Sequence, residues 1–508
     1  MDHVDVSLVK QVMMIFLVKF QRSLFLLSIL ALQMLPAAIA QENEVVDTIP
    51  VRISYTSKAQ EARLKQIVLE KYKAAIEEEK QNHYFETRLT WEQIIYLRLK
   101  NYDVALVFTL ASNEISPAYH TYSELVHELD SLAERYPRLI RLKQIGSSTS
   151  RKVPIWAAKL SDNPIYEEDE PAVLITGVHH AREPLGAEIC LYLIKYFCGH
   201  YEHDAQIKQW LDATEIWLVP VLNPDGLDLA LNPDRRLGWW RKNCRDNNRN
   251  GRFDSDSDGV DLNRNYDFNW SDGISDVTSL YFKGAEPFSE QETRAIRDLA
   301  FQQNFIVILD YHSFGEAILY PWGNFYKAPE QNLIQDIARK FAACISKLGG
   351  QSAYDVIPLD ARMGQSSVWY YAELNALAYI IETADEYYPP TERIQPICKQ
   401  NLKGIRYILE RLHTSRLCGH IRDAETGMPL VAQVKISDLN RVYTKPRQSD
   451  ARWGRYDKIL YPGTYSITFS ALGYKSKKIP KIVIHEDKPT VLDVELFEER
   501  PERPLGNY

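Results

Sequence analysis

The sequence predicts an α/β protein whose central sheet is covered by helices on both faces. Strand-like runs alternate with helical segments between residues 119 and 412, and the runs are almost continuously apolar. Strands that are buried on both faces have this character. The strands are expected at Ala172–Val178, Glu215–Leu222, Phe305–Tyr311 and Ala376–Ile381, and the helices at Tyr122–Tyr136, Gly186–Gly199, Ser289–Gln303 and Asn332–Leu348. In such sheets the functional residues collect beyond the strand ends.

Smaller modules are predicted on either side of this α/β domain. The first combines a strand at VRISY, a charged helix at Ala59–Glu79 and a closing strand at YDVALVF, and is therefore a small α+β module. The second has short alternating strands between Gly and Pro turn signals, as a β-sandwich does. The predicted domains are residues 1–40, 41–115, 116–415 and 416–508.

Length and composition limit the kinds of protein that this can be. The chain has 508 residues, 45% of them apolar and 25% charged, which excludes wholesale disorder. Its 60 basic and 68 acidic residues give a net charge of −8, and no stretch is strongly basic. A nucleic-acid partner is therefore not expected.

Residues 1–40 have the pattern of a secretory signal peptide. Lys19 and Arg22 precede the apolar run Leu24–Leu35, and Ala38-Ile39-Ala40 has the small-x-small form of a cleavage site. The run of 12 residues is shorter than the ~20 that span a bilayer. We expect an exported protein, secreted or periplasmic, with no stable membrane span after cleavage. An uncleaved anchor is the alternative.

Three side chains are of the types that bind zinc. His180 and Glu183 follow the strand Ala172–Val178 and are three residues apart, which puts both on one side of a turn or helix. His312 ends the apolar run FIVILDYH. Two imidazoles and a carboxylate leave zinc one open position for water, as in catalytic sites. Each residue alone also has a structural interpretation, because HxxE patterns and single histidines are common.

Glu382 is a candidate general base. It follows the apolar strand ALAYII, and a carboxylate there is costly to bury unless it is paired or functional. Zinc lowers the pKa of a bound water from 15.7 to about 7, so that a nearby carboxylate can complete the deprotonation.

The segments WWRKN and DLNRN supply Arg241, Asn263 and Arg264. An Asn-Arg pair in a loop suits the bidentate binding of a carboxylate. A second arginine could stabilise the oxyanion of a tetrahedral intermediate. The alternative is that these residues are simply solvated.

Six motifs in order, GVHHAREP, NPDG, WRKN, DLNRN, YHS and IIETAD, resemble the zinc carboxypeptidase family typified by carboxypeptidase A. The resemblance covers Tyr119–Leu412 and implies a mixed sheet between helices. It also implies one zinc ion per chain and hydrolysis of the C-terminal peptide bond of peptides or proteins.

The same resemblance implies a role for each matching residue. The zinc ligands would be His180, Glu183 and His312, with Glu382 as general base. Arg241 would polarise the scissile carbonyl. Asn263 and Arg264 would bind the free C-terminal carboxylate. Asp261 would orient His180, which fixes the tautomer and the ring position.

Two features depart from the family pattern or extend beyond it. The place of the family's mobile tyrosine holds Asp360, and Tyr354, Tyr370 or Tyr371 could substitute, so we expect altered specificity rather than an inert site. The modules at 41–115 and 416–508 resemble, respectively, a propeptide-like module and a transthyretin-like regulatory β-domain.

An Asp/Asn-rich stretch at residues 246–259 resembles a calcium loop. Oxygen-bearing side chains alternate along it, and a Gly stands at its sixth place, but Ser257 replaces the usual Glu at the twelfth. The candidate ligands are Asp246, Asn248, Asn250, Asp254, Asp256 and Asp258. A solvated loop is the alternative.

Two other functions remain open from the sequence. A zinc amidase acting on cell-wall peptides would use the same four residues, His180, Glu183, His312 and Glu382. A non-catalytic peptide-binding relative would explain the missing tyrosine, but it would not require Glu382. The sequence does not determine the oligomeric state or the preferred terminal residue.

Overall fold

The computed structural model describes residues 49–499, except 56, 81–83, 91–92, 95, 98–99, 101, 107–114, 233–236, 323–327, 351, 360–362, 438 and 440–442. The predicted signal peptide and Asp360 therefore lie outside the described residues. The chain divides into two compact units, Met1–Leu106 and Val107–Tyr508. In the part of the chain that is described, no helix is both long and apolar enough to cross a membrane.

The first unit contains a four-stranded antiparallel sheet and helix α2 (Lys58–Gln66). Its strands are β1 (Ile49–Ser54), β2 (Ile76–Lys80), β3 (Tyr84–Leu89) and β4 (Asp103–Leu106), in the order β2-β3-β1-β4. The predicted helix Ala59–Glu79 is too long. Helix α2 (Lys58–Gln66) and a short π-helical turn end at Lys71, and Ile76–Lys80 pairs with β3 instead. Cross-strand pairing thus overrides the helix propensity of a Glu-rich segment.

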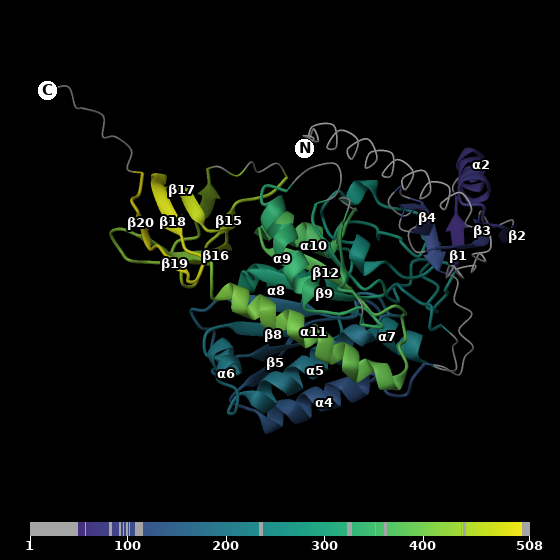
Figure 1. Cartoon of the computed structure of the whole chain (residues 1–508), viewed down its shortest axis with the longest axis horizontal. Helices are drawn as coiled ribbons and strands as arrows, with labels where there is room; N and C mark the ends of the chain where they lie inside the picture. Colours follow the sequence, from purple (N-terminus) through teal and green to yellow (C-terminus); the bar gives the residue numbers. More distant parts are fainter. Residues whose placement is uncertain are drawn as a thin grey trace, which may run out of the picture. The chain divides into compact units, whose positions relative to one another are not determined.

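The second unit contains a mixed eight-stranded sheet, as the family resemblance implied (Figure 1). The order is β11-β10-β12-β9-β7-β8-β6-β5, in which β12, β9, β7 and β8 run parallel. The strands are β5 (Ile140–Ser147), β6 (Pro154–Leu160), β7 (Ala172–Thr176), β8 (Glu215–Val219), β9 (Val307–Ser313), β10 (Ala317–Tyr320), β11 (Asp355–Pro358) and β12 (Leu377–Thr383). The four parallel strands are the four that the sequence predicted.

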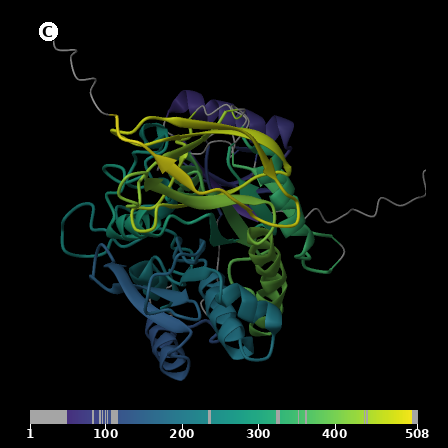
Figure 2. The ribbon, with the colours of Figure 1, turned by 90° about the vertical axis from the view of Figure 1, so that its left-hand side faces the viewer.

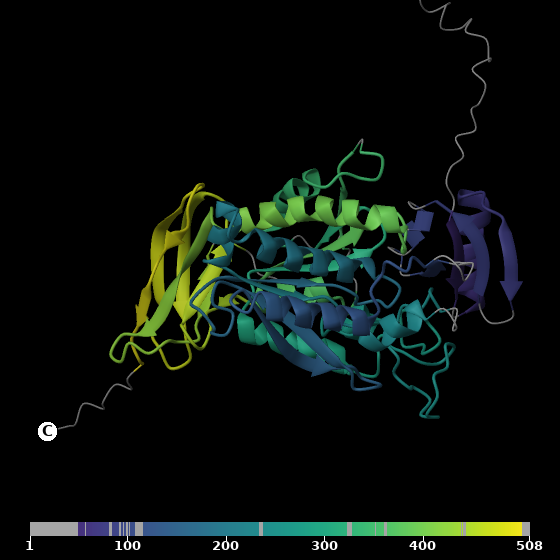
Figure 3. The same ribbon diagram turned by 90° about the horizontal axis from the view of Figure 1, so that it is seen from below.

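Helices cover both faces of this sheet. One face, with Leu174, Trp217 and Ile308, forms a buried core with α8 and α10. On the other face α4, α5 and α11 lie side by side (Figures 1 and 3). The helices are α4 (Tyr122–Arg135), α5 (Leu185–His200), α6 (Ala205–Leu211), α7 (Pro224–Leu231), α8 (Gln291–Gln303), α9 (Gln331–Ala343), α10 (Ser366–Trp369) and α11 (Thr391–Leu412).

Strands β13–β20 form a β-sandwich, which faces the viewer in Figure 2. One sheet has the order β16-β13-β19, with β20 also paired to β13, and the other β15-β14-β17-β18. The strands are β13 (Arg416–Asp423), β14 (Gln433–Ile436), β15 (Arg447–Gln448), β16 (Arg455–Ile459), β17 (Gly463–Ser470), β18 (Lys477–Ile484), β19 (Thr490–Val491) and β20 (Val494–Leu496). The buried Arg447 donates to the main-chain oxygens of Phe305 (2.9 Å) and Leu374 (3.0 Å), just before β9 and β12.

Helix α11 passes closely over α9 at Gly404. A Cβ atom added to Gly404 would lie 1.9 Å from Cε2 of the buried Phe341. Only glycine therefore allows these two helices to approach so closely.

We predict that Gly404→Val lowers the free energy of unfolding by about 1–3 kcal/mol, the usual cost of overpacking a core. Lys403→Val is the matched control, because Lys403 is the exposed neighbour on the same helix. Urea denaturation of both variants tests this. Equal effects of the two substitutions would contradict the close approach of the helices.

Candidate metal centre

The turn after β7 presents the first two candidate ligands. Strand β7 ends at Thr176, and His180 and Glu183 follow before α5 begins at Leu185. A Cβ on Gly177 would come within 2.6 Å of the Pro220 oxygen and 2.7 Å of the Gly186 carbonyl carbon. Glycine is thus required where the turn passes between α5 and the end of β8. The turn is also held by a hydrogen bond from the Ala181 N–H to the Arg241 oxygen (3.0 Å).

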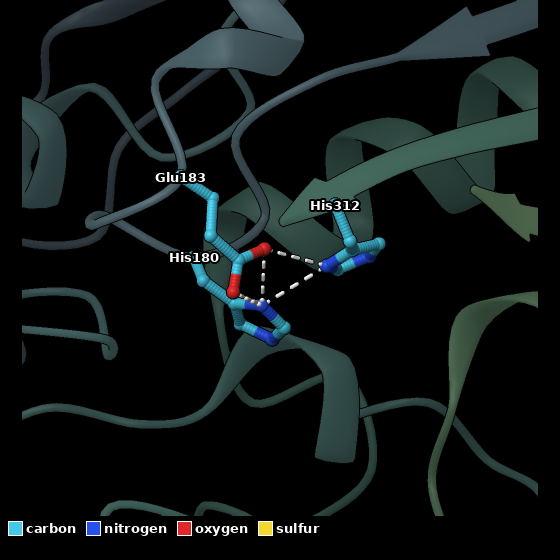
Figure 4. A group of neighbouring side chains, drawn as sticks. All are labelled: His180, Glu183 and His312. Carbon is cyan, nitrogen blue, oxygen red and sulfur yellow. Dashed lines mark hydrogen bonds and ion pairs between the residues drawn. The ribbon is translucent and has the colours of Figure 1, made fainter. Parts of the chain in front are cut away.

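His180, Glu183 and His312 meet in one buried cluster (Figure 4). The Nδ1 atoms of His180 and His312 are 3.0 Å apart, and each lies 2.9 Å from the Glu183 carboxylate. Two imidazole nitrogens and a carboxylate that face one point are the donor set that zinc prefers. The residues therefore fit a zinc ion.

The electrostatics of the cluster favour the protonation states in which these residues bind a metal ion. Burial, followed by the neighbouring His180, lowers the pKa of His312 to about 4. Burial raises the pKa of Glu183, but the His180 and His312 imidazoles outweigh it and hold this pKa well below 4.5. A neutral imidazole and an ionised carboxylate are the forms that bind metal ions.

Asp261 lies behind the cluster and contacts two functional candidates. One of its oxygens is 3.2 Å from His180 Nε2, and the other accepts from Arg241 Nε at 2.9 Å. Burial raises the pKa of Asp261, but Arg241, Arg264 and His180 together lower it well below its ordinary value. An ionised carboxylate at Nε2 keeps the proton on that nitrogen, so that Nδ1 faces the cluster.

Arg241 reaches the cluster directly. Its Nη1 atom lies 3.2 Å from His180 Nδ1, and its guanidinium lies over the Tyr281 ring, 5.0 Å from the centroid. Burial lowers the pKa of Arg241, but Asp261, Tyr281 and Glu183 together outweigh burial and raise it, so that the guanidinium stays charged. The Arg264 guanidinium also lies over the Tyr281 ring, 5.4 Å from its centroid.

Asn263 lies between the cluster and α10. Its Nδ2 atom is 3.4 Å from His312 Nε2, and its Oδ1 accepts from the Ser366 N–H at 2.9 Å. The structure thus brings Arg241, Asn263 and Arg264 together around the three candidate ligands, although their segments are far apart in sequence.

Glu382 is the direct register partner of His312 in the parallel pair β9–β12. Residues paired in this way project from the same face of a sheet. The half-buried Glu382 therefore lies on the same side as His312 and next to it. The three substitutes considered for the family tyrosine are all buried: Tyr354 contacts Thr383, Tyr370 contacts Tyr266, and Tyr371 donates to Glu330.

The expected calcium loop receives no support. Asp246 accepts from the main-chain N–H groups of Asn250 and Gly251, and Asp258 from those of Asn247 and Asp254. Among the described residues of this loop, no three carboxylates gather at one point. Hydrogen bonds within the loop account for its Asp/Asn-rich sequence.

Sequence reasoning missed a buried polar group beneath the cluster. Asp310 lies two residues before His312, is fully buried, and accepts from Thr176 Oγ1 at 2.6 Å and from Ser366 Oγ. The His179 ring stacks on the His312 ring, with the ring centroids 5.2 Å apart, and His179 Nε2 lies 2.9 Å from the Tyr266 hydroxyl. The one available signal was a charged residue inside the apolar run FIVILDYH.

The comparisons with known proteins agree with this geometry. The model of the zinc carboxypeptidase family matches residues 125–404, more than half of the chain. The chain belongs to the zinc carboxypeptidase family. Mouse (Mus musculus) carboxypeptidase A4 is 30% identical over 318 residues, which cover 60% of this chain and 71% of the relative.

Other similarities are more distant. Carboxypeptidase D of Anas platyrhynchos is 25% identical over 379 residues, which cover 70% of this chain but only 25% of that protein. The chain likewise spans about half (51%) of the zinc carboxypeptidase of Saccharothrix mutabilis. Carboxypeptidase A from Helicoverpa armigera shares the fold of the present chain (TM-score 0.53, 22% identity, 72% of this chain and 97% of that one). Thrombin-activatable fibrinolysis inhibitor also shares it (TM-score 0.54, 20% identity, 71% and 98%).

A buried acid supports the segment that carries Arg241. Glu290 accepts from Asn243 and Arg245, and its neighbour Glu292 accepts from the Thr149 N–H at 2.8 Å. Burial, and then Glu290, raise the pKa of Glu292 to about 7. The protonated Glu292 therefore contributes fully to the stability of the protein below pH 4.5, and this contribution is lost as the pH rises through 7.

We predict that Glu292→Gln stabilises the protein relative to wild type increasingly between pH 5 and 7.5, by up to about 1.4 kcal/mol per pH unit. Urea denaturation at several pH values measures the difference. The exposed Glu134→Gln serves as control. A difference that does not change with pH would contradict the raised pKa.

Proposed function

We propose that this chain is an exported zinc carboxypeptidase that removes the C-terminal residue of peptides or proteins. The observation that carries the proposal is the convergence of His180, Glu183 and His312 with Glu382 in register beside them. A binding protein would not need a carboxylate next to a metal centre. Export is inferred from residues 1–40 alone.

The three clustered residues would hold the zinc ion. When bound, zinc supplies a Lewis acid that polarises a carbonyl group and lowers the pKa of water. His180 is kept in the required tautomer by Asp261, which lies 3.2 Å from its Nε2. Asp261 thus has an orienting role in the proposal.

Residues around the cluster would bind and orient the substrate. Arg264 and Asn263 would bind the free terminal carboxylate, because a guanidinium and an amide N–H are strong donors to it. Arg241 would stabilise the negative charge that develops on the scissile carbonyl oxygen. Its position beside His180 supports this role.

Glu382 would move the proton. Its carboxylate would accept a proton from the attacking water and pass it to the amine of the departing residue. One half-buried acid on the same side of the sheet as His312 can serve both steps, since the attacking water oxygen and the leaving amine nitrogen are both bonded to the scissile carbonyl carbon during the reaction.

We predict that Glu382→Gln lowers kcat by roughly 10²–10⁴-fold, the usual contribution of a general base. Zinc content should be unchanged, because Glu382 is not among the three clustered residues. Hydrolysis of a synthetic dipeptide and metal analysis of the same sample test both points. The exposed Glu410→Gln on α11 is the control. Unchanged hydrolysis at full zinc content would exclude this mechanism.

We predict that Arg264→Ala raises KM for peptides with a free C-terminus by roughly 10- to 150-fold, the effect of losing a hydrogen bond to a charged group. A peptide amide should be a poor substrate of wild type, and the variant should change its hydrolysis little. Peptidoglycan fragments form the third arm of this assay. Their preferential cleavage would favour the cell-wall amidase instead.

A further inference from the structure

The side-chain amide of Asn263 can be placed in two orientations, and the structure decides between them. Its oxygen accepts the Ser366 N–H at 2.9 Å, so that its NH₂ group faces the other way, 3.4 Å from His312 Nε2. A rotation by 180° would oppose two N–H donors across 2.9 Å. The Ser366 N–H therefore fixes which end of the amide faces His312.

The Ser366 N–H is available for this role because of its place in the fold. Ser366 is the first residue of α10, where N–H groups have no acceptor within the helix. Gln365 before it is extended and supplies no side-chain cap. The Asn263 oxygen takes over the role of the missing acceptor.

Ser366 is itself held from below. Its hydroxyl donates to Asp310, whose other oxygen accepts from Thr176 Oγ1 at 2.6 Å. Thr176 and Asp310 are register partners in β7 and β9, the strands that lead to His180 and carry His312. The position of Ser366 is thus tied to the same two strands as the candidate ligands.

A second contact ties the two loops together. Gly364 (φ +67°) packs so closely on Arg264 that an added Cβ would lie 2.0 Å from the Arg264 oxygen. Tyr266 N–H donates to the Gly364 oxygen at 3.0 Å, and the Gly364 N–H to the Phe268 oxygen at 2.7 Å. Segments 263–268 and 364–366 therefore form one hydrogen-bonded unit.

We propose that Ser366 is a positioning residue for the substrate's C-terminal carboxylate and acts through the amide of Asn263. A carboxylate only accepts hydrogen bonds, so it can bind the NH₂ end of the amide and is repelled by the oxygen end. By occupying Oδ1, Ser366 keeps the NH₂ end on the substrate side. This role rests on the proposed function, in which Asn263 contacts that carboxylate.

The direct test compares Ser366→Pro with Ser366→Ala. Both variants lack the hydroxyl, but only proline lacks the N–H, and proline is well tolerated at the first position of a helix. We expect Ser366→Pro to raise KM for a free-carboxylate dipeptide roughly five- to thirtyfold above that of Ser366→Ala. This is less than the roughly 10- to 150-fold effect of removing a hydrogen bond to a charged group, because the Asn263 amide remains in place. The value of kcat should change less than about threefold and zinc content not at all, because the transferred proton and the metal are handled by other residues.

A double-mutant cycle separates positioning from general damage. In an Asn263→Ala background, Ser366→Pro should raise KM no further, because the amide through which it acts is gone. An equal rise in both backgrounds, or equal KM values for Ser366→Pro and Ser366→Ala, would overturn the proposal.

The variant Asn263→Asp tests the orientation of the amide even if Ser366→Pro does not fold. Asn263→Asp can still accept from the Ser366 N–H but presents an oxygen in place of the NH₂ group. We expect its KM to exceed that of Asn263→Ala, and an equal or lower KM would count against the orientation mechanism. If Asn263→Ala itself left KM unchanged, the proposed carboxylate site would fail instead.

Discussion

The parallel pairing of β7, β9 and β12 is the constraint on which the site depends. Parallel strands end at one edge of a sheet, so the residues at or just after these ends are brought together from three distant stretches of chain. His180 follows β7, His312 lies near the end of β9, and Glu382 is its register partner in β12. A shift of β12 by one residue would turn Glu382 to the opposite face and separate it from the cluster.

A cluster of charges in the interior must be balanced group by group. Glu183 and Asp261 are both buried carboxylates, and each has a partner that keeps it ionised: the imidazoles for the first, and Arg241 for the second. Arg241 contacts both groups, at 2.9 Å from Asp261 and 3.8 Å from Glu183. Arg241 thus offsets part of the negative charge of the two buried carboxylates, which lowers the free-energy cost of burying them.

Buried polar groups outside the cluster also have hydrogen-bond partners. Asp310 accepts hydrogen bonds from two hydroxyl groups, those of Thr176 and Ser366, and it links the sheet to the loop that carries Ser366. Arg447 of the β-sandwich donates to main-chain oxygens just before β9 and β12. Polar contacts from other parts of the chain therefore hold the starts of β9 and β12, and also β9 at Asp310.

The sequence by itself determined the elements and the chemistry. Continuous apolar runs predicted β7, β8, β9 and β12, and residue type and spacing predicted that His180, Glu183 and His312 could bind zinc. The family resemblance supplied the mixed sheet. Local patterns of this kind are set by burial of the strand itself and by the chemistry of single side chains, which do not require knowledge of neighbours.

The tertiary structure alone decided which groups share a partner. The β2 strand replaced the end of a predicted helix because it pairs with β3, and the Asp/Asn-rich loop satisfies its own main-chain N–H groups rather than gathering its carboxylates. Asp310, Ser366 and Asn263 became one connected set only when β9 was placed beside β7 and below α10. Hydrogen-bond partners depend on distances of about 3 Å between segments that are far apart in sequence, and no spacing along the chain encodes them.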